Sequence, residues 1–143
     1  MNDAAIRDVM YRYARGVDRK DAQMVLDCYH PDAMDDHAGA FVGLAPDFVA
    51  WCMGSLAKYK RTMHLLGQIL IEYSDDGNRA QVESYCHASH ILADGVEGRN
   101  FSSQVRYLDR FERRPQADGS PGPWKIADRV VTRDIAPLTL ALL

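Results

Sequence analysis

The chain has 143 residues, of which 47% are hydrophobic and 26% are charged, and its formal net charge is -3. These values are ordinary for a folded globular protein, and the length suits one domain with a single substantial core. We therefore expect one domain over residues 1–143. The acidic balance and the dispersed Arg and Lys residues exclude nucleic acid as the main partner.

Three cysteines, Cys28, Cys52 and Cys86, are odd in number, widely spaced and surrounded by apolar residues. This usage predicts buried, reduced thiols rather than a disulfide framework, and it indicates a reducing compartment. No basic segment followed by an apolar run opens the sequence, and no segment approaches the roughly 18 apolar residues needed to cross a bilayer. We expect a cytoplasmic protein that does not contact a membrane.

Three helices are predicted in the first 60 residues. Residues 2–17 carry apolar side chains at spacings of three and four, which places one apolar stripe on a helix. A short helix should follow over 21–29 and end at His30 and Pro31. The third should begin at 45–47, with a proline in its first turn, and end near residue 60. The intervening segment, 32–43, has a mixed pattern typical of a short strand or a loop.

Segments rich in β-forming residues follow at 62–74, 81–92, 101–113 and 124–133. The sequence Asp-Asp-Gly-Asn at 75–78 is a strong hairpin signal between the first two. The expected fold class is α+β, with three N-terminal helices on one face of a curved four-stranded antiparallel meander that encloses an apolar pocket. The apolar residues 135–143 should pack over the sheet, the pocket mouth or a neighbouring subunit.

The most specific chemical hypothesis joins Asp18, at the end of the first helix, to His64, at the head of a later strand. A near-neutral histidine can take a proton from carbon or hydroxyl, and an adjacent carboxylate orients the ring and stabilises its charge. Asp18 lies on the shoulder of the apolar stripe, so it can reach a cavity edge. Two alternatives stay open. Asp18 could cap the second helix, and His64 could be a hydrogen-bonded histidine without a catalytic role.

Two further side chains are candidates for the same pocket. Tyr13 lies on the apolar stripe one turn before Val17, so its ring should point inward and its hydroxyl needs a buried partner or a ligand. A core tyrosine without a function fits the same pattern. Arg129 alternates with small apolar residues on the last strand, where it would be either a cavity-facing anion stabiliser or an outward-facing charge. Arg133 has the same parity and competes for this role.

A metal site is not expected. Asp35, Asp36 and His37, with His30 nearby, form one local cluster without a second histidine at ligand spacing, so a solvated acidic loop is the favoured interpretation. His87 and His90 are three apart on a predicted strand and should point to opposite faces. They are therefore a poor ligand pair, although either could line the cavity alone. The sequence has no Gly-rich phosphate loop, nucleophile elbow or HExxH motif.

Four pieces of the sequence together resemble the SnoaL-like family of the nuclear transport factor 2 superfamily. They are YRYARGVDRKD at 11–21, YHPDA at 29–33, the histidine at position 64 that opens a long strand, and WKIADR at 124–129. They cover the chain end to end in the family's order. The resemblance implies a cone-shaped α+β fold and a homo-oligomer of two or three subunits.

Within that family the pattern is similar to the hexachlorocyclohexane dehydrochlorinase and bile-acid 7α-dehydratase group, whose members eliminate with an Asp-His dyad. The resemblance maps the dyad to Asp18 and His64. It maps an assisting residue, tyrosine in the dehydratase and lysine in the dehydrochlorinase, to Tyr13, and a C-terminal arginine to Arg129. The implied function is a lyase that needs no metal or organic cofactor and removes a proton from a small apolar cyclic substrate, while Tyr13 and Arg129 assist the leaving hydroxyl or halide.

Fold alone does not settle the activity, because relatives of this fold include polyketide cyclases, scytalone dehydratase and ketosteroid isomerase. A cyclase or a ketosteroid-type isomerase is therefore the nearest enzymatic alternative. The same fold also forms the β subunits of ring-hydroxylating dioxygenases, which are structural partners. The alternative from another class is a non-catalytic, ligand-binding or β-subunit-like module.

Overall fold

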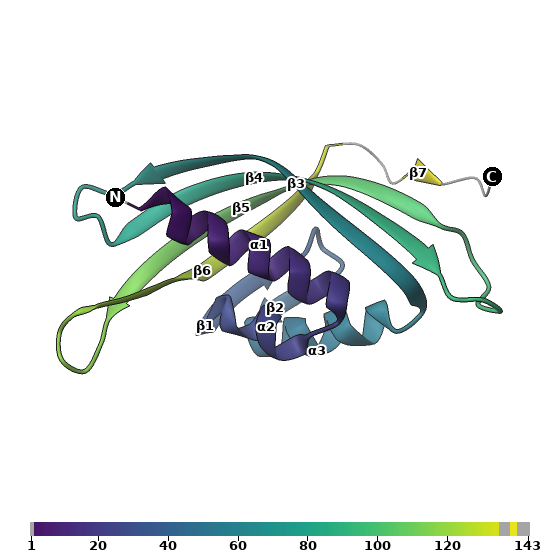
Figure 1. Ribbon diagram of the computed structural model, residues 1–143, viewed down its shortest axis with the longest axis horizontal. Coiled ribbons are helices and arrows are strands. Elements are labelled where there is room, and N and C mark those ends of the chain that lie inside the picture. Colours follow the sequence, from purple (N-terminus) through teal and green to yellow (C-terminus); the bar gives the residue numbers. More distant parts are fainter. Residues whose placement is uncertain (1, 135–137, 140–143) are drawn as a thin grey trace.

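The computed structural model describes residues 2–134 and 138–139, and it shows three helices packed against one side of a strongly curved sheet (Figure 1). The helices are α1 (Asp3–Arg19), α2 (Ala22–Asp27) and α3 (Ala45–Leu56). The strands are β1 (Tyr29–Asp36), β2 (Val42–Leu44), β3 (Tyr59–Tyr73), β4 (Arg79–Leu92), β5 (Phe101–Pro115), β6 (Pro121–Arg133) and β7 (Leu138–Thr139). The predicted α+β class, with three N-terminal helices, is confirmed.

The strand order is β2-β1-β6-β5-β4-β3, and β7 pairs with β5. Strands β3 to β6 form the predicted antiparallel meander, and residues 74–78 turn between β3 and β4 as expected. The prediction of four strands was incomplete, because β1 extends the sheet by pairing in parallel with β6. The sheet is therefore mostly, but not wholly, antiparallel.

Strand β1 begins earlier than the short strand or loop expected over 32–43, because His30 and Pro31 were interpreted as the end of the second helix. Proline is tolerated in a strand where the ladder does not need its missing N–H. The pairing of β1 with β6 is irregular between Tyr29 and Met34, and Pro31 lies in that irregular part. The helix itself ends at Asp27, two residues earlier than expected.

Helix α1 is longer than predicted, and this changes the setting of Asp18. It continues to Arg19, so Asp18 lies inside its last turn. The cap of α2 is Asp21, whose side chain accepts the backbone N–H of Met24 at 3.0 Å. The alternative that Asp18 caps α2 is therefore wrong. A β-carbon at Gly16 would lie 2.8 Å from Val25 Cγ2, so the glycine permits the close approach of α1 and α2.

Helix α3 ends earlier than predicted, at Leu56, and β3 begins at Tyr59. Tyr59 is buried and is paired with Leu92 of β4. The backbone of Lys58 also accepts a hydrogen bond from Ala93, at 3.0 Å. Residues 57–60, which local helical spacing assigned to α3, therefore lie outside the helix, and Tyr59 pairs with β4 instead.

All three cysteines are free and buried, as predicted. Burial raises the pKa of Cys28 and of Cys86 to about 11 and that of Cys52 to about 12, so these thiols stay protonated near neutral pH. Among the described residues, no helix is both long and apolar enough to cross a membrane. The expected packing of the apolar end, 135–143, lies outside the described residues except for β7, whose backbone pairs with residues 101–102 of β5.

Candidate active site

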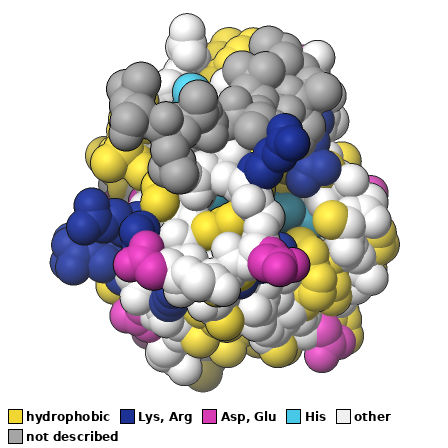
Figure 2. Space-filling model, turned by 90° about the vertical axis from the view of Figure 1, so that its right-hand side faces the viewer, with side chains coloured by type: hydrophobic (Ala, Val, Ile, Leu, Met, Phe, Trp, Pro, Cys, Tyr) yellow, Lys and Arg dark blue, Asp and Glu magenta, His cyan; other side chains and the backbone are white. Residues whose placement is uncertain are grey.

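A cavity of about 290 Å³ lies between the C-terminal half of α1, α3 and the sheet. Figure 2 looks at this end of the molecule and shows hydrophobic side chains at the centre of a hollow, with acidic and basic side chains around it. Five aromatic residues and three histidines are among those that line the cavity: Tyr13, Trp51, Tyr59, Phe101, Tyr107, His37, His64 and His90. Its size and mostly apolar lining suit a small molecule.

The structure brings Asp18 and His64 together at this cavity. His64 Nδ1 lies 2.7 Å from Asp18 Oδ1, and the backbone N–H of His64 donates to Asp18 Oδ2 at 2.9 Å. The hydroxyl of Thr62 donates to Asp18 Oδ1, also at 2.9 Å. Because a carboxylate only accepts hydrogen bonds, it holds the ring with the proton on Nδ1 and leaves Nε2 as the basic nitrogen.

The position of this pair follows from local structure. Asp18 is in the last turn of α1, next to β3. Residues two apart on a strand point to the same side, so Thr62 and His64 both reach the carboxylate. Burial raises the pKa of Asp18, but the hydrogen bonds from His64 and Thr62 outweigh it, and the net pKa lies below its ordinary value. Asp18 is therefore charged at neutral pH.

Tyr13 points inward, as predicted, and lines the cavity with only 2% of its surface exposed. Its ring packs edge to face against Tyr29 and Tyr107, with centroids 6.2 and 5.7 Å away. Burial raises its pKa well above the ordinary value, so the phenol is neutral. Among the described residues the hydroxyl has no hydrogen-bond partner, which leaves it available to a ligand.

Arg129 lies in the core beneath the cavity rather than on its surface. Its Nε and Nη2 donate to the two oxygens of Asp109, both at 2.7 Å, and Nη1 donates to the hydroxyl of Tyr29 at 3.1 Å. The guanidinium stacks between Tyr13 and Tyr107, 4.2 and 4.4 Å from the ring centroids.

This corrects the expectation that Arg129 faces either the cavity or solvent. Asp109 is its cross-strand partner on β5 and is equally buried, so each charge neutralises the other inside the fold. Although burial opposes its charge, Asp109 keeps the pKa of Arg129 well above the ordinary value. Arg133, the competing residue, is exposed and lines the cavity.

The prediction of a solvated acidic loop at 35–37 was wrong for Asp35. This residue is completely buried on β1, where pairing with β6 draws it into the fold. Its Oδ2 accepts the Tyr29 hydroxyl at 2.7 Å, and its Oδ1 lies 3.1 Å from His37 Nδ1. Among the described residues, no group of three or more His, Cys, Asp or Glu side chains is placed to hold a metal ion.

His90 is a cavity residue that the sequence hypothesis left unassigned. Its ring stacks on Phe101 with centroids 4.3 Å apart and lies 5.7 Å from the ring of His64. Burial and the neighbouring His64 lower its pKa to about 4, so it is neutral at ordinary pH. His87 instead lines a hollow on the opposite face of β4, as its spacing predicted. The inward alternation of Cys86, Ala88 and His90 was the signal that could have identified it.

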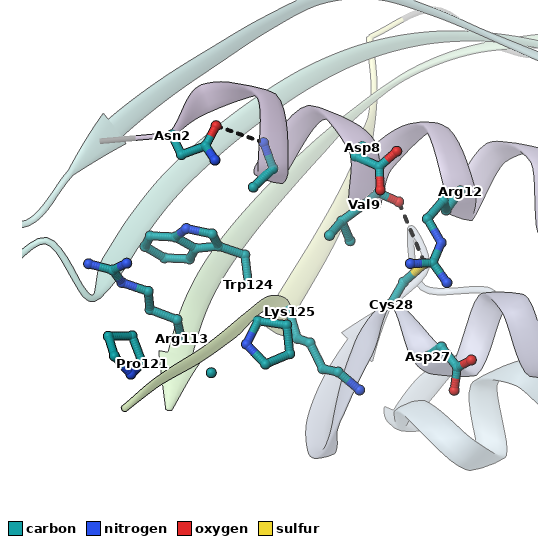
Figure 3. A pocket seen from close by; sticks show the side chains of 13 residues that line it. Asn2, Asp8, Val9, Arg12, Asp27, Cys28, Arg113, Pro121, Trp124 and Lys125 are labelled. Carbon is teal, nitrogen blue, oxygen red and sulfur yellow. Dashed lines mark hydrogen bonds between the residues drawn. The ribbon is translucent and has the colours of Figure 1, made fainter. Parts of the chain in front are cut away.

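A second hollow, about 520 Å³ in volume, lies along the N-terminal half of α1 and the start of β6 (Figure 3). Charged and polar side chains from α1, α2, β5 and β6 surround it, including Asp8, Arg12 and Arg113. Arg113 lies over the ring of Trp124, 5.4 Å from its centroid. Cys28 also lines this hollow, but its thiol is protonated, and no histidine is among its described lining residues. The smaller cavity is therefore the better candidate for acid-base chemistry.

A sequence model of the SnoaL-like domain matches residues 2–130. The chain belongs to the SnoaL-like family. No curated protein sequence matches this SnoaL-like chain. Many solved structures share its fold, and three of them illustrate the range.

One is a scytalone dehydratase-like protein of Novosphingobium aromaticivorans DSM 12444, with a TM-score of 0.78, 19% identity, and coverage of 97% of this chain and 87% of the other. A LinA-type3 hexachlorocyclohexane dehydrochlorinase of Novosphingobium barchaimii LL02 has a TM-score of 0.79 and 18% identity. The match covers 98% of this chain and 90% of the dehydrochlorinase. ActVI-ORFA of Streptomyces coelicolor has a TM-score of 0.69 and 18% identity. The match covers 92% of this chain and 96% of ActVI-ORFA. At these identities the likeness confirms the expected cone-shaped α+β fold and does not establish the reaction.

Proposed function

We propose that this SnoaL-like protein is a lyase that works without a cofactor, of the dehydratase or dehydrohalogenase type, acting on a small apolar cyclic substrate. The observation that carries the proposal is the Asp18–His64 pair, joined at 2.7 Å at the edge of a largely apolar cavity. The side chain of His64 is 10% exposed and that of Asp18 is 23% exposed, so the pair is accessible without being fully solvated.

In this mechanism His64 Nε2 removes a proton from a ring carbon of the substrate. Asp18 keeps the ring in the correct tautomer and stabilises the imidazolium that forms. Tyr13 contributes a neutral hydroxyl donor to the leaving group or to a developing oxyanion. Arg129 does not reach the cavity, so its proposed role changes from direct assistance to positioning, through its stacking on Tyr13 at 4.2 Å.

The relatives support this class of reaction. One of the structural neighbours is a dehydrochlorinase and another is scytalone dehydratase-like, and both are elimination enzymes by name. A non-catalytic module is less well supported, because in such a module the polar groups would be sealed or point away from the cavity. Here His37, His64 and His90 all line it.

A ketosteroid-type isomerase or a cyclase is the second candidate. The specific observation in its favour is His90, a neutral imidazole whose ring centre lies 5.7 Å from that of His64. Two neighbouring histidines could move a proton between two carbons of one ring and retain the formula of the substrate. Product mass separates the two candidates, since elimination releases water or halide and isomerisation releases nothing.

We further propose a single SnoaL-like domain that forms a cytoplasmic homo-oligomer of two or three subunits. The buried free thiols support a reducing compartment. The outer face of the sheet supports association, because large apolar side chains are exposed on neighbouring strands: Met63, Leu65, Leu70, Tyr85, Leu108 and Val130. An apolar face of this kind marks an interaction surface.

The test combines a substrate screen with two variants. Cyclic β-hydroxy ketones, steroid alcohols and cyclic halides are screened for elimination, and His64→Ala and Asp18→Asn are assayed on each substrate that the wild type converts. We expect both variants to lose about 10²- to 10⁴-fold in kcat, the usual contribution of a general base.

The matched control is His87→Ala, which removes a histidine from the outer face of the adjacent strand and should retain full activity. Circular dichroism and urea unfolding check that each variant is folded. Near-normal turnover by folded His64→Ala would contradict the proposal.

A further inference from the structure

We propose that His37, paired with Asp35, is a second catalytic residue of this cavity and acts as the general acid that protonates the departing oxygen. This inference rests on the proposed elimination and deepens it, since it favours substrates whose leaving group is a hydroxyl. The basis is a second aspartate–histidine pair that lines the same cavity as the first.

The second pair has the same internal geometry as the first. In both, a carboxylate Oδ1 faces the Nδ1 of the histidine, at 2.7 Å for Asp18 and His64 and at 3.1 Å for Asp35 and His37. Asp35 thus fixes the proton of His37 on Nδ1. Among the described residues Nε2 of His37 has no partner, so it is the nitrogen left for a ligand.

The fold brings the two histidines to the cavity from strands that are far apart in the sheet. His37 directly follows β1, and His64 is on β3, with β6, β5 and β4 between these two strands in the sheet. The sheet is strongly curved (Figure 1), and both histidines line the cavity that it forms with the helices. Two histidines in one cavity suit elimination, because a base acts on a carbon–hydrogen bond while an acid can act on the oxygen of the neighbouring carbon.

The ring of His37 is held firmly. It stacks on Phe48 with centroids 4.8 Å apart and an interplanar angle of 24°. Its backbone N–H donates to the carbonyl of Phe41 at 2.8 Å, and its own carbonyl accepts from Ala40 at 3.1 Å. The tight turn forces Ala38 to a φ of 53°, which is uncommon for a residue with a β-carbon.

Asp35 belongs to a buried group of charged side chains. Asp35 is completely buried, and Tyr29 connects it to Arg129, which is already paired with Asp109. This buried group contains two carboxylates and one guanidinium, and an imidazolium formed at His37 during the reaction would have the carboxylate of Asp35 as its partner. An uncompensated buried carboxylate would be costly. An imidazolium with Nδ1–H on Asp35 and Nε2–H toward the cavity is the form that a general acid requires.

The proposed step balances without an oxidant or a cofactor. His64 Nε2 takes the proton from the carbon, and the electron pair of that bond forms the carbon–carbon double bond. The carbon–oxygen bond breaks, and the proton on His37 Nε2 goes to the departing oxygen, which leaves as water. His64 then returns its proton to solvent and His37 takes one up, so the net reaction converts the substrate to an alkene and water.

The experiment compares two probes that give the same product. 3-Hydroxycyclohexanone and 3-acetoxycyclohexanone both eliminate to 2-cyclohexenone, which is followed by its ultraviolet absorbance. Hydroxide needs a proton to depart, whereas acetate does not. We expect His37→Asn, which can still donate to Asp35, to lose about 10²- to 10⁴-fold in kcat on the hydroxy probe and only a few-fold on the acetoxy probe. His64→Ala should lose activity on both probes, and His87→Asn, the control, on neither.

Two outcomes would overturn this inference alone: an equal loss on both probes by folded His37→Asn, or no loss on either, while His64→Ala loses both. If His37→Asn fails to fold, His37→Gln is used instead, and its loss of kcat on the hydroxy probe is compared with its loss on the acetoxy probe. Absence of wild-type turnover on the hydroxy probe, or an unimpaired His64→Ala, would instead overturn the proposed function and this inference with it.

Discussion

Asp18 and Asp109 each accept a hydrogen bond from a basic side chain at 2.7 Å, yet the two pairs sit in opposite environments. The side chains of Asp109 and Arg129 are completely buried, whereas those of Asp18 and His64 are 23% and 10% exposed. A sealed pair of full charges has a structural role, because each charge compensates the other and neither meets a ligand. A pair that a ligand can reach, and in which one partner is a histidine, can exchange protons. The contrast separates a structural role from a chemical one within one small protein.

The largest expected effect comes from breaking the sealed pair. Arg129→Met leaves Asp109 without its partner, and the free energy of unfolding should fall by about 3–5 kcal/mol. Urea unfolding measures this change. Replacing both residues, Asp109→Leu with Arg129→Met, should recover much of the loss, because no charge is then left uncompensated. His64→Ala should cost clearly less, because Asp18 keeps its hydrogen bonds from Thr62 and from the backbone N–H of residue 64. Equal losses in the free energy of unfolding for Arg129→Met and His64→Ala would contradict the assignment of different roles to the two pairs.

An intermediate effect on stability is expected at His90, which lines the cavity and has no charged partner among the described residues. Its pKa is about 4 in the folded protein and near 6.5 when unfolded, so between these values the unfolded chain binds more protons. The free energy of unfolding should therefore fall as pH drops from 6.5 toward 4. His90→Gln should reduce this loss between pH 7 and pH 5, measured by urea unfolding at each pH.

The low pKa of Asp18 does not confound this test. A lowered carboxyl pKa stabilises the fold above the ordinary value of 3.8 and is lost only below it, outside the window from pH 7 to pH 5. An identical pH dependence in the wild type and in His90→Gln would show that His90 is not held neutral by burial.

The smallest effect on folding is expected on the outer face of the sheet, far from either pair. Leu65 and Leu108 are 66% and 40% exposed there, so Leu65→Lys and Leu108→Glu should change intrinsic stability by only about 0.5 kcal/mol. We expect both substitutions to convert the oligomer to monomers, as measured by light scattering. Tyr11→Lys, at a 54% exposed residue of α1, is the control and should keep the wild-type mass. A monomeric wild type would refute the proposed association.

Local pattern was enough to predict the elements that bring Asp18 and His64 together. The apolar stripe of α1 placed Asp18 at a cavity edge, and the β-rich pattern from residue 62 onward placed His64 at the head of a strand. The distance between them depended on how α1 crosses β3, which no local pattern encodes. The family resemblance supplied that link, and the geometry agrees with it.

Long-range pairing explains what the sequence did not reveal. Arg129 had the correct parity, but its partner Asp109 is on the neighbouring strand, twenty residues away. Asp35 looked solvated because its neighbours are polar, whereas a parallel pairing of β1 with β6 buries it. The same pairing positions the second aspartate–histidine pair, Asp35 and His37. Because the pairing was not predicted, this segment was interpreted as a solvated loop.

The most direct test of the account is whether His64 removes a proton from carbon. The protein is incubated in D₂O with 3-hydroxycyclohexanone, and NMR follows deuterium entering the carbon next to the carbonyl together with formation of 2-cyclohexenone. We expect the wild type to accelerate loss of this proton, and His64→Gln and Asp18→Asn to reduce the acceleration by about 10²-fold or more. Folded His64→Gln that removes the proton as fast as the wild type would contradict the account.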